Sequence, residues 1–136
     1  MALRILVADD HVMLRRSVVQ ALQSDAGMQV VGEAGDGVMA VRLTRMLKPD
    51  VVIMDVVMPT LNGIDATRQI VHDCPRVHVV GLSVHASGAY AKRMLDAGAS
   101  AYVLKDGDVD ELVRAVDTVS HGGTYLSRDI PGFHPH

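Results

Sequence analysis

Residues 51–59 read VVIMDVVMP, an apolar run with a single carboxylate, Asp55, at its centre. A carboxylate that is buried without a partner is costly, because it loses its hydration and gains nothing in return. A chain that places one in an apolar strand therefore needs an open strand end or an opposite charge beside it. The segments on either side of this run predict that Asp55 has both.

Short apolar segments alternate with segments of helical periodicity along the chain. The predicted strands are residues 3–8, 28–32, 51–54, 77–82 and 100–104. The predicted helices are residues 11–24, 36–47, 62–72, 87–96 and 108–120, with Asp10 and Asp36 as N-caps and with Gly98 and Gly122 after helix ends. Such alternation is typical of an α/β protein. We therefore predict a five-stranded parallel sheet of order 2-1-3-4-5, doubly wound by five helices.

The composition limits the class of protein. The chain has 136 residues, of which 49% are hydrophobic, with no Trp and one Phe. One domain with an aliphatic, Met-rich core is therefore expected, and Met13, Met39, Met46 and Met94 are expected to fill it. A formal net charge of -3 argues against a broad basic surface for nucleic acid. The single cysteine and the lack of a long apolar run indicate a soluble, cytoplasmic protein.

Polar residues follow the predicted strands at the points where the strands end. They are Asp9 and Asp10 after the first strand, Asp55 after the third, Ser83 after the fourth and Lys105 after the fifth. In a parallel sheet these positions share one edge, where ligands bind. Three neighbouring carboxylates repel one another unless a cation lies among them, and oxygen ligands with room for water and phosphate favour Mg²⁺. The pattern predicts a phosphoryl site in which Asp55 is the nucleophile and forms an acyl phosphate.

These residues resemble, in order and spacing, the receiver domain of two-component response regulators. The resemblance covers residues 3–122 and rests on Asp9-Asp10, Asp55, Met58-Pro59, Gly63, Ser83 and Lys105. The segments ILVADDHVMLRRSV and ELVRAVDTVSHGGTYLS are similar to those of the NarL/FixJ (LuxR-type) subfamily. The resemblance implies the flavodoxin-like receiver fold.

The resemblance also implies a phosphoacceptor and a metal site. Asp55 would accept a phosphoryl group from a sensor histidine kinase. Asp10, Asp55 and the backbone carbonyl of Val57 would bind Mg²⁺ directly, and Asp9 would act through a metal-bound water.

A conformational switch is implied as well. Ser83 and Lys105 would bind the phosphoryl oxygens, and Tyr102 would turn inward as Ser83 moves. The change would reshape a partner surface on the fourth helix, fifth strand and fifth helix, near Tyr90, Met94 and Tyr102. The chain would then be a phosphorylation-controlled module that forms a homodimer, and at most would catalyse its own phosphorylation and dephosphorylation.

Some positions depart from the common receiver pattern. Lys105 is followed by Asp106 and not by proline, so no cis-proline is expected there. Val57 and His85 stand at the positions that tune dephosphorylation, which leaves the phosphate lifetime open. The seven histidines show no metal-ligand spacing, and we expect them to be surface residues.

Residues 123–136 show no periodicity and are expected to form a linker or tail after a receiver domain of residues 1–122. NarL/FixJ-type proteins continue into a helix-turn-helix DNA-binding domain. The resemblance therefore implies that an output domain is absent from this chain and that DNA is contacted only through it. The alternative is a stand-alone receiver that acts by protein–protein contact.

Two enzyme classes offer competing interpretations. An aspartyl-phosphate phosphatase of the haloacid dehalogenase type needs a second aspartate two residues after the nucleophile, but that position holds Val57. A dinucleotide-binding oxidoreductase is suggested by GDGVMA at residues 35–40, which matches G-x-G-x-x-A. That segment follows the second predicted strand and not the first, so it lies away from the expected ligand edge.

Overall fold

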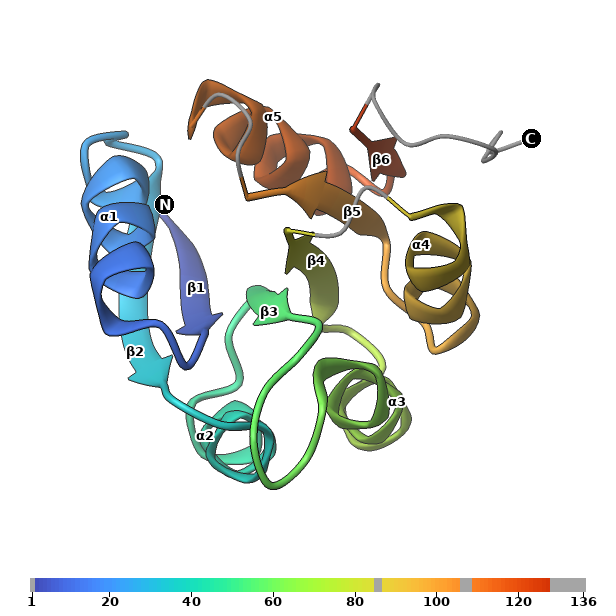
Figure 1. The fold of residues 1–136 in the computed structure, drawn as a ribbon. Helices are drawn as coiled ribbons and strands as arrows, with labels where there is room; N and C mark the ends of the chain where they lie inside the picture. Colours follow the sequence, from blue (N-terminus) through green and yellow to red (C-terminus); the bar gives the residue numbers. More distant parts are fainter. Residues whose placement is uncertain (1, 85–86, 106–108, 128–136) are drawn as a thin grey trace.

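The computed structural model describes residues 2–84, 87–105 and 109–127, which form one parallel sheet between two layers of helices (Figure 1). The strands are β1 (Leu3–Ala8), β2 (Met28–Ala34), β3 (Val51–Asp55), β4 (His78–Ser83), β5 (Ala101–Leu104) and β6 (Tyr125–Leu126). The helices are α1 (Val12–Gln23), α2 (Gly37–Leu47), α3 (Gly63–Asp73), α4 (Gly88–Asp96) and α5 (Val109–Ser120). The predicted doubly wound α/β fold is confirmed.

The sheet has the strand order β2-β1-β3-β4-β5-β6, and each neighbouring pair is parallel. The predicted order of the first five strands is confirmed, but the sheet has one strand more than predicted. Residues Tyr125 and Leu126 pair with Ala101 and Tyr102, in the segment that was expected to be a linker. Ordered structure therefore continues past residue 122 to Ser127.

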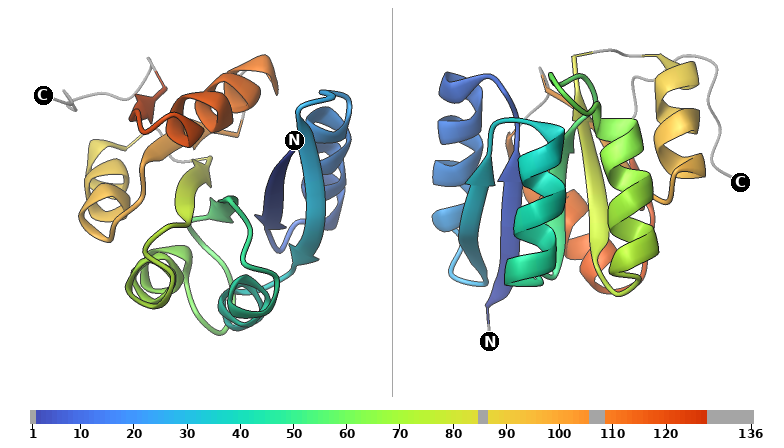
Figure 2. Two further views of the ribbon diagram at one scale, coloured as in Figure 1. Left: turned by 180° about the vertical axis from the view of Figure 1, so that it is seen from behind. Right: turned by 90° about the horizontal axis from the view of Figure 1, so that it is seen from below.

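The strands are apolar because both faces of the sheet are covered. Successive residues of β3 alternate between two clusters: Val52 and Met54 face α2, α3 and α4, whereas Val51 and Ile53 face α1 and α5. The view from below in Figure 2 shows α2, α3 and α4 side by side on one face of the sheet. Both clusters are aliphatic, as the composition predicts.

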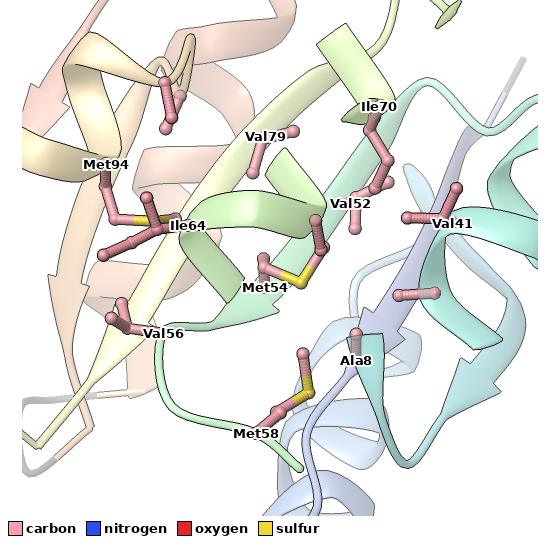
Figure 3. Close-up of a cluster of buried hydrophobic side chains, with 14 of the residues drawn as sticks. Ala8, Val41, Val52, Met54, Val56, Met58, Ile64, Ile70, Val79 and Met94 are labelled. Atoms are coloured by element: carbon pink, nitrogen blue, oxygen red, sulfur yellow. The ribbon is translucent and has the colours of Figure 1, made fainter. Parts of the chain in front are cut away.

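The first cluster packs tightly around the end of β3. Figure 3 shows Val52 and Met54 among Val41 of α2 and Ile64 and Ile70 of α3. This packing fixes the backbone of β3 directly before Asp55, and so holds that carboxylate in place.

The residues that cap the helices agree only in part with the sequence-based predictions. Asp36 caps α2, because its side chain accepts a hydrogen bond from the Met39 amide at 2.8 Å. The assignment of Asp10 as the cap of α1 is wrong: the N-cap is His11, and it makes no side-chain capping bond. Gly98 has a φ of 112°, a left-handed conformation that favours glycine after a helix.

The methionines differ from the expected core role. Met94 is completely buried, but Met13 is 84% exposed, Met46 is 69% exposed and Met39 is 37% exposed. These three side chains lie on the outer faces of α1 and α2, because the buried stripes of those helices run through other residues.

Some sequence-based expectations fall on residues outside the described ranges. They concern His85, Asp106, Asp108 and residues 128–136. Among the residues that the structure does describe, no helix is long and apolar enough to cross a bilayer.

Candidate functional site

The polar residues predicted to share one edge of the sheet do lie there. Asp9 and Asp10 follow β1, Asp55 and Ser83 end β3 and β4, and Lys105 follows β5. Strands β1 and β3 are neighbours although they are not consecutive in the sequence. This is the point where the strand order reverses, and ligands bind there in open α/β sheets.

Lys105 joins two of the carboxylates. Its Nζ atom lies 2.8 Å from Oδ2 of Asp9 and 3.2 Å from Oδ2 of Asp55. All three side chains are almost fully buried, with 5% or less of each exposed. Asp55 is therefore paired, as its position in an apolar run requires, but it shares its counter-charge with Asp9.

This shared ammonium leaves Asp55 short of positive charge. The pKa of Asp55 is raised from 3.8 to about 7, first by burial and then by the neighbouring charge of Asp9, while Lys105 opposes both effects. Two buried carboxylates beside one ammonium remain under-compensated, so the site favours a further cation.

The donor set at this edge fits a hard divalent cation. Asp9, Asp10, His11 and Asp55 each offer one ligand atom, and these atoms all lie within 4.8 Å of one another. The Oδ2 atoms of Asp9 and Asp55 are buried, face Lys105, and receive no hydrogen bond of good geometry. Three carboxylates, two of which have an unsatisfied buried oxygen, suit Mg²⁺, which prefers oxygen ligands.

Val57 lies in the loop that follows β3. Its amide N–H donates to Oδ1 of Asp55 at 3.3 Å, and its side chain is 51% exposed. This contact holds the loop against the acidic cluster, where the resemblance places the Val57 backbone carbonyl among the metal ligands.

His11 is a member of the cluster that the sequence interpretation missed. Its ring is 67% exposed, as expected of a surface histidine, yet Nδ1 lies 3.2 Å from Oδ1 of Asp9 and 3.3 Å from Oδ1 of Asp10. The His11 amide also donates to Oδ1 of Asp9 at 2.8 Å. The signal that points to it is its place directly after the acid pair at a strand end.

Ser83 connects the acidic cluster to the fifth strand. Its backbone carbonyl accepts a hydrogen bond from the Lys105 amide at 2.8 Å, and its side chain is buried. Burial raises the pKa of Tyr102, and a hydrogen bond with the Ser83 side chain acts in the opposite direction. Ser83 and Tyr102 are therefore in contact, as a switch pair would be.

Two of the three residues expected near the partner surface lie in the core in this structure. Met94 and Tyr102 are both completely buried, so neither contributes to a surface in this conformation. Tyr90 is only partly buried. The tyrosine ring instead fills the core between β5 and α4, close to Gly81, where an added Cβ would lie 3.4 Å from the ring.

A glycine allows the loop after β3 to fold back on the strand. The Gly63 amide donates to the Val56 carbonyl at 2.8 Å, and a Cβ at Gly63 would lie 1.9 Å from the Asp55 carbonyl oxygen. No other residue fits there, so Gly63 sets how closely α3 approaches Asp55.

The glycine-rich segment at residues 35–40 has a structural explanation. Asp36 caps α2, and a Cβ at Gly37 would lie 1.9 Å from the Leu61 carbonyl oxygen. The segment follows β2, which is an outer strand of the sheet. Capping and close packing account for these residues without a dinucleotide.

Comparison with known proteins adds independent information. A family model described as the response regulator receiver domain matches residues 5–117. The chain is 40% identical over 124 residues to the transcriptional regulatory protein DegU of Brevibacillus brevis, covering 91% of this chain and 52% of that protein. It is 39% identical over 128 residues to the response regulator GacA of Pseudomonas viridiflava, covering 94% of this chain and 60% of that protein.

A solved structure is also similar over nearly its whole length. The crystal structure of a two-component response regulator of the LuxR family from Aurantimonas sp. SI85-9A1 has a TM-score of 0.92 and 36% sequence identity. The match covers 96% of this chain and 93% of that one. By contrast, this chain spans between about half and three fifths of the length of the two curated relatives.

Proposed function

This chain belongs to the response regulator receiver domain family, and on that premise we propose that it accepts a phosphoryl group from a sensor histidine kinase on Asp55. The observation that carries the proposal is the place of Asp55 at the open end of β3, with the Lys105 ammonium 3.2 Å from Oδ2. Asp9 and Asp10 lie beside it, within reach of a common cation.

The transfer is a displacement at phosphorus. An Oδ atom of Asp55 forms a bond to the phosphorus while the phosphorus–nitrogen bond of the kinase's phosphohistidine breaks, and the imidazole nitrogen keeps the electron pair. Lys105 donates to one phosphoryl oxygen, and the Ser83 hydroxyl donates to another. Bound Mg²⁺ would supply positive charge for the phosphoryl oxygens, and Asp9, Asp10, Asp55 and the Val57 carbonyl are the groups that would hold it.

Phosphorylation of Asp55 is expected to change the surface of α4, β5 and α5. New hydrogen bonds from Ser83 and Lys105 to the phosphoryl group exist in only one arrangement of the loop after β4, so phosphorylation favours that arrangement. Contact between Ser83 and Tyr102 supports this route from the site to β5.

The output of the switch is proposed to be transcription. DegU is named a transcriptional regulatory protein, and this chain matches about half of its length. We place the receiver domain in residues 1–122 and assign residues 123–136 to the connection with a DNA-binding output domain. The first part of this segment includes β6, which pairs with β5.

Intact-mass measurement after incubation with acetyl phosphate and Mg²⁺ tests the proposal. The wild type is expected to gain one phosphoryl group, Asp55→Asn to gain none, and EDTA to prevent the gain. Asp96→Asn is a matched control, because Asp96 is a 65% exposed carboxylate on α4 that pairs with Lys92. A phosphoryl adduct that persists in Asp55→Asn would refute the assignment.

A further inference from the structure

His11 brings a nitrogen donor into a site whose other donors are oxygens. Its Nδ1 atom faces two carboxylates at once, Asp9 at 3.2 Å and Asp10 at 3.3 Å. Although His11 is the N-cap of α1, its side chain makes no capping hydrogen bond. The orientation of the ring is therefore not explained by the start of the helix.

These separations suit a shared cation. Ligands placed about 2.1 Å from a metal at right angles to one another lie about 3.0 Å apart, and opposite ligands about 4.2 Å apart. The distances of 3.2 and 3.3 Å from Nδ1 to the two Oδ1 atoms are close to the first value. The span of 4.8 Å for the whole group, which includes Asp55, exceeds the second by a few tenths of an ångström.

A second observation indicates that a cation belongs here. Asp9 and Asp55 are 1% and 3% exposed, and their Oδ2 atoms receive no hydrogen bond of good geometry. The Lys105 ammonium lies beside both carboxylates and is shared between them. Buried carboxylate oxygens in this state are stabilised by a metal ion.

We infer that His11 is a direct ligand, through Nδ1, of a first-row transition ion bound at this edge. The inference rests on the proposed function, since it concerns the same metal site. Neutral imidazole prefers first-row transition ions such as Co²⁺ and Zn²⁺, whereas an oxygen-only set suits Mg²⁺. The receiver domain therefore binds Co²⁺ and Zn²⁺ with a contribution from His11 that is absent when Mg²⁺ is bound.

This assignment determines which nitrogen of the His11 ring carries the proton. Nδ1 carries the lone pair that binds the metal, so the ring proton resides on Nε2. The competing arrangement is a ring whose proton lies on Nδ1, where it donates a hydrogen bond to Oδ1 of Asp9 at 3.2 Å and does not bind a metal.

Calorimetric titration of the metal-depleted protein with Co²⁺ and with Mg²⁺ separates these arrangements. His11→Ala is expected to lower Co²⁺ affinity at least about tenfold and to change Mg²⁺ affinity by less than about twofold. His72→Ala is the matched control: its Nδ1 lies 3.3 Å from a carboxylate oxygen of Asp73, on an 88% exposed ring in α3. It should change neither affinity.

A spectroscopic measurement identifies the ligand atom directly. In ¹⁵N spectra recorded during a Zn²⁺ titration, the Nδ1 resonance of His11 should move while Nε2 remains protonated, and the resonances of His72 should not move. Circular dichroism should confirm that both variants keep the fold.

The outcomes distinguish the inference from the proposed function. If the wild type binds Mg²⁺ but His11→Ala keeps its Co²⁺ affinity, or loses both affinities equally, His11 is not a selective ligand and only the inference is overturned. If the wild type binds neither ion, the metal-dependent part of the proposed function is overturned with it.

Discussion

At the scale of single residues, the charge balance around Asp55 governs both stability and chemistry. Asp55 and Asp9 are buried and share the Lys105 ammonium. Such an arrangement is a poor stabiliser of the fold but a good receptor for a metal ion, because the metal ion brings the positive charge that the site lacks. The apolar run before Asp55 thus serves to hold an under-compensated carboxylate at a fixed position.

Metal-free wild-type protein is expected to become less stable as the pH rises from about 4 to about 8. The pKa of Asp55 is about 7 in the folded protein and 3.8 for an ordinary aspartate, so the folded state binds more protons than the unfolded state between these values. The free energy of unfolding is therefore highest below pH 3.8 and falls until the pH passes about 7. The total loss is about 1.4 kcal/mol for each unit by which the two pKa values differ.

Urea unfolding in EDTA at about pH 5 and about pH 8 measures this effect. Asp55→Asn should show a smaller loss of stability between the two pH values, because asparagine does not ionise. Saturating Mg²⁺ should also reduce the loss in the wild type. Equal pH dependence in wild type and Asp55→Asn would show that Asp55 is not the titrating group.

At the scale of elements, the connection between β3 and α3 decides where Asp55, the proposed phosphoacceptor, lies. Gly63→Ala is expected to destabilise the domain by roughly 1–3 kcal/mol, since a Cβ would meet the Asp55 carbonyl at 1.9 Å and force the loop away. Phosphorylation by acetyl phosphate should slow as well, because Asp55 would shift relative to Lys105.

Gly35→Ala is the control for this substitution. It lies in another strand-to-helix loop, where the nearest atom to an added Cβ, on Arg15, is 3.5 Å away. Thermal unfolding and the phosphorylation rate should both remain near the wild-type values. If Gly63→Ala behaves in the same way, the close approach of α3 to β3 does not position the site.

The hydroxyl group of Ser127, directly after β6, links this strand to β5 and α5. The Ser127 Oγ atom accepts a hydrogen bond from the Leu104 amide at 3.0 Å and donates one to the Glu111 carboxylate of α5, while the Ser127 amide donates to the Tyr102 carbonyl at 3.0 Å. Leu104 directly precedes Lys105, so β6 is attached next to the proposed phosphoryl site.

Ser127→Ala is expected to release β6 and to cost about 1–2 kcal/mol, because Glu111 and the Leu104 amide lose their partner. Hydrogen exchange should speed up at the Leu104 and Tyr125 amides and not in β1 or β3. Ser120→Ala is the control, since its hydroxyl bonds only to carbonyl and imidazole groups at the end of α5. Unchanged exchange at Tyr125 would contradict the role of Ser127.

The sequence predicted these elements unevenly, for physical reasons. Every predicted strand and helix exists, because apolar runs and helical periodicity report burial directly. β6 was missed because two residues carry no periodicity, and their pairing depends on the free edge of β5 and on Ser127. The exposed Met13 and Met46 show that periodicity locates a helix better than it assigns each apolar side chain to a face.

The site was predicted in the same uneven manner. The sequence predicted that Asp9, Asp55 and Lys105 lie together, because each follows or ends a strand and the topology of a parallel sheet places these positions at one edge. The contact of His11 with two carboxylates depends on the rotation of one ring, which no pattern of residue types reports. The burial of Tyr102 was likewise invisible, because a strand tyrosine packs inward or outward according to its neighbours.

At the scale of the whole molecule, the site lies at one edge of the sheet and the proposed responsive surface lies on α4, β5 and α5. Suppose that phosphorylation changes the population ratio of two conformations of this domain from about 1:99 to 99:1. Such a change requires about 5.5 kcal/mol. Two charge-assisted hydrogen bonds, from Ser83 and Lys105, contribute about 1.5–3 kcal/mol each and are of the right order.

We expect a beryllofluoride complex of Asp55, a mimic of the phosphoryl group, to increase self-association of the chain. Sedimentation velocity with and without the mimic should show a shift toward dimer, and Asp55→Asn should show none. The chain should not bind specific DNA in either state, given its net charge of -3. Sequence-specific DNA binding by these residues alone would contradict the proposed division between receiver and output.

The burial of Tyr102 gives the molecule a built-in optical reporter. The chain has no tryptophan and three tyrosines, so its near-ultraviolet emission comes from tyrosine alone. One of these chromophores is completely buried and hydrogen-bonded to Ser83, whereas Tyr90 and Tyr125 are only partly buried. Any event at Asp55 that draws Ser83 away alters the surroundings of that phenol, and the change can be followed in real time without a dye, a label or a substituted side chain.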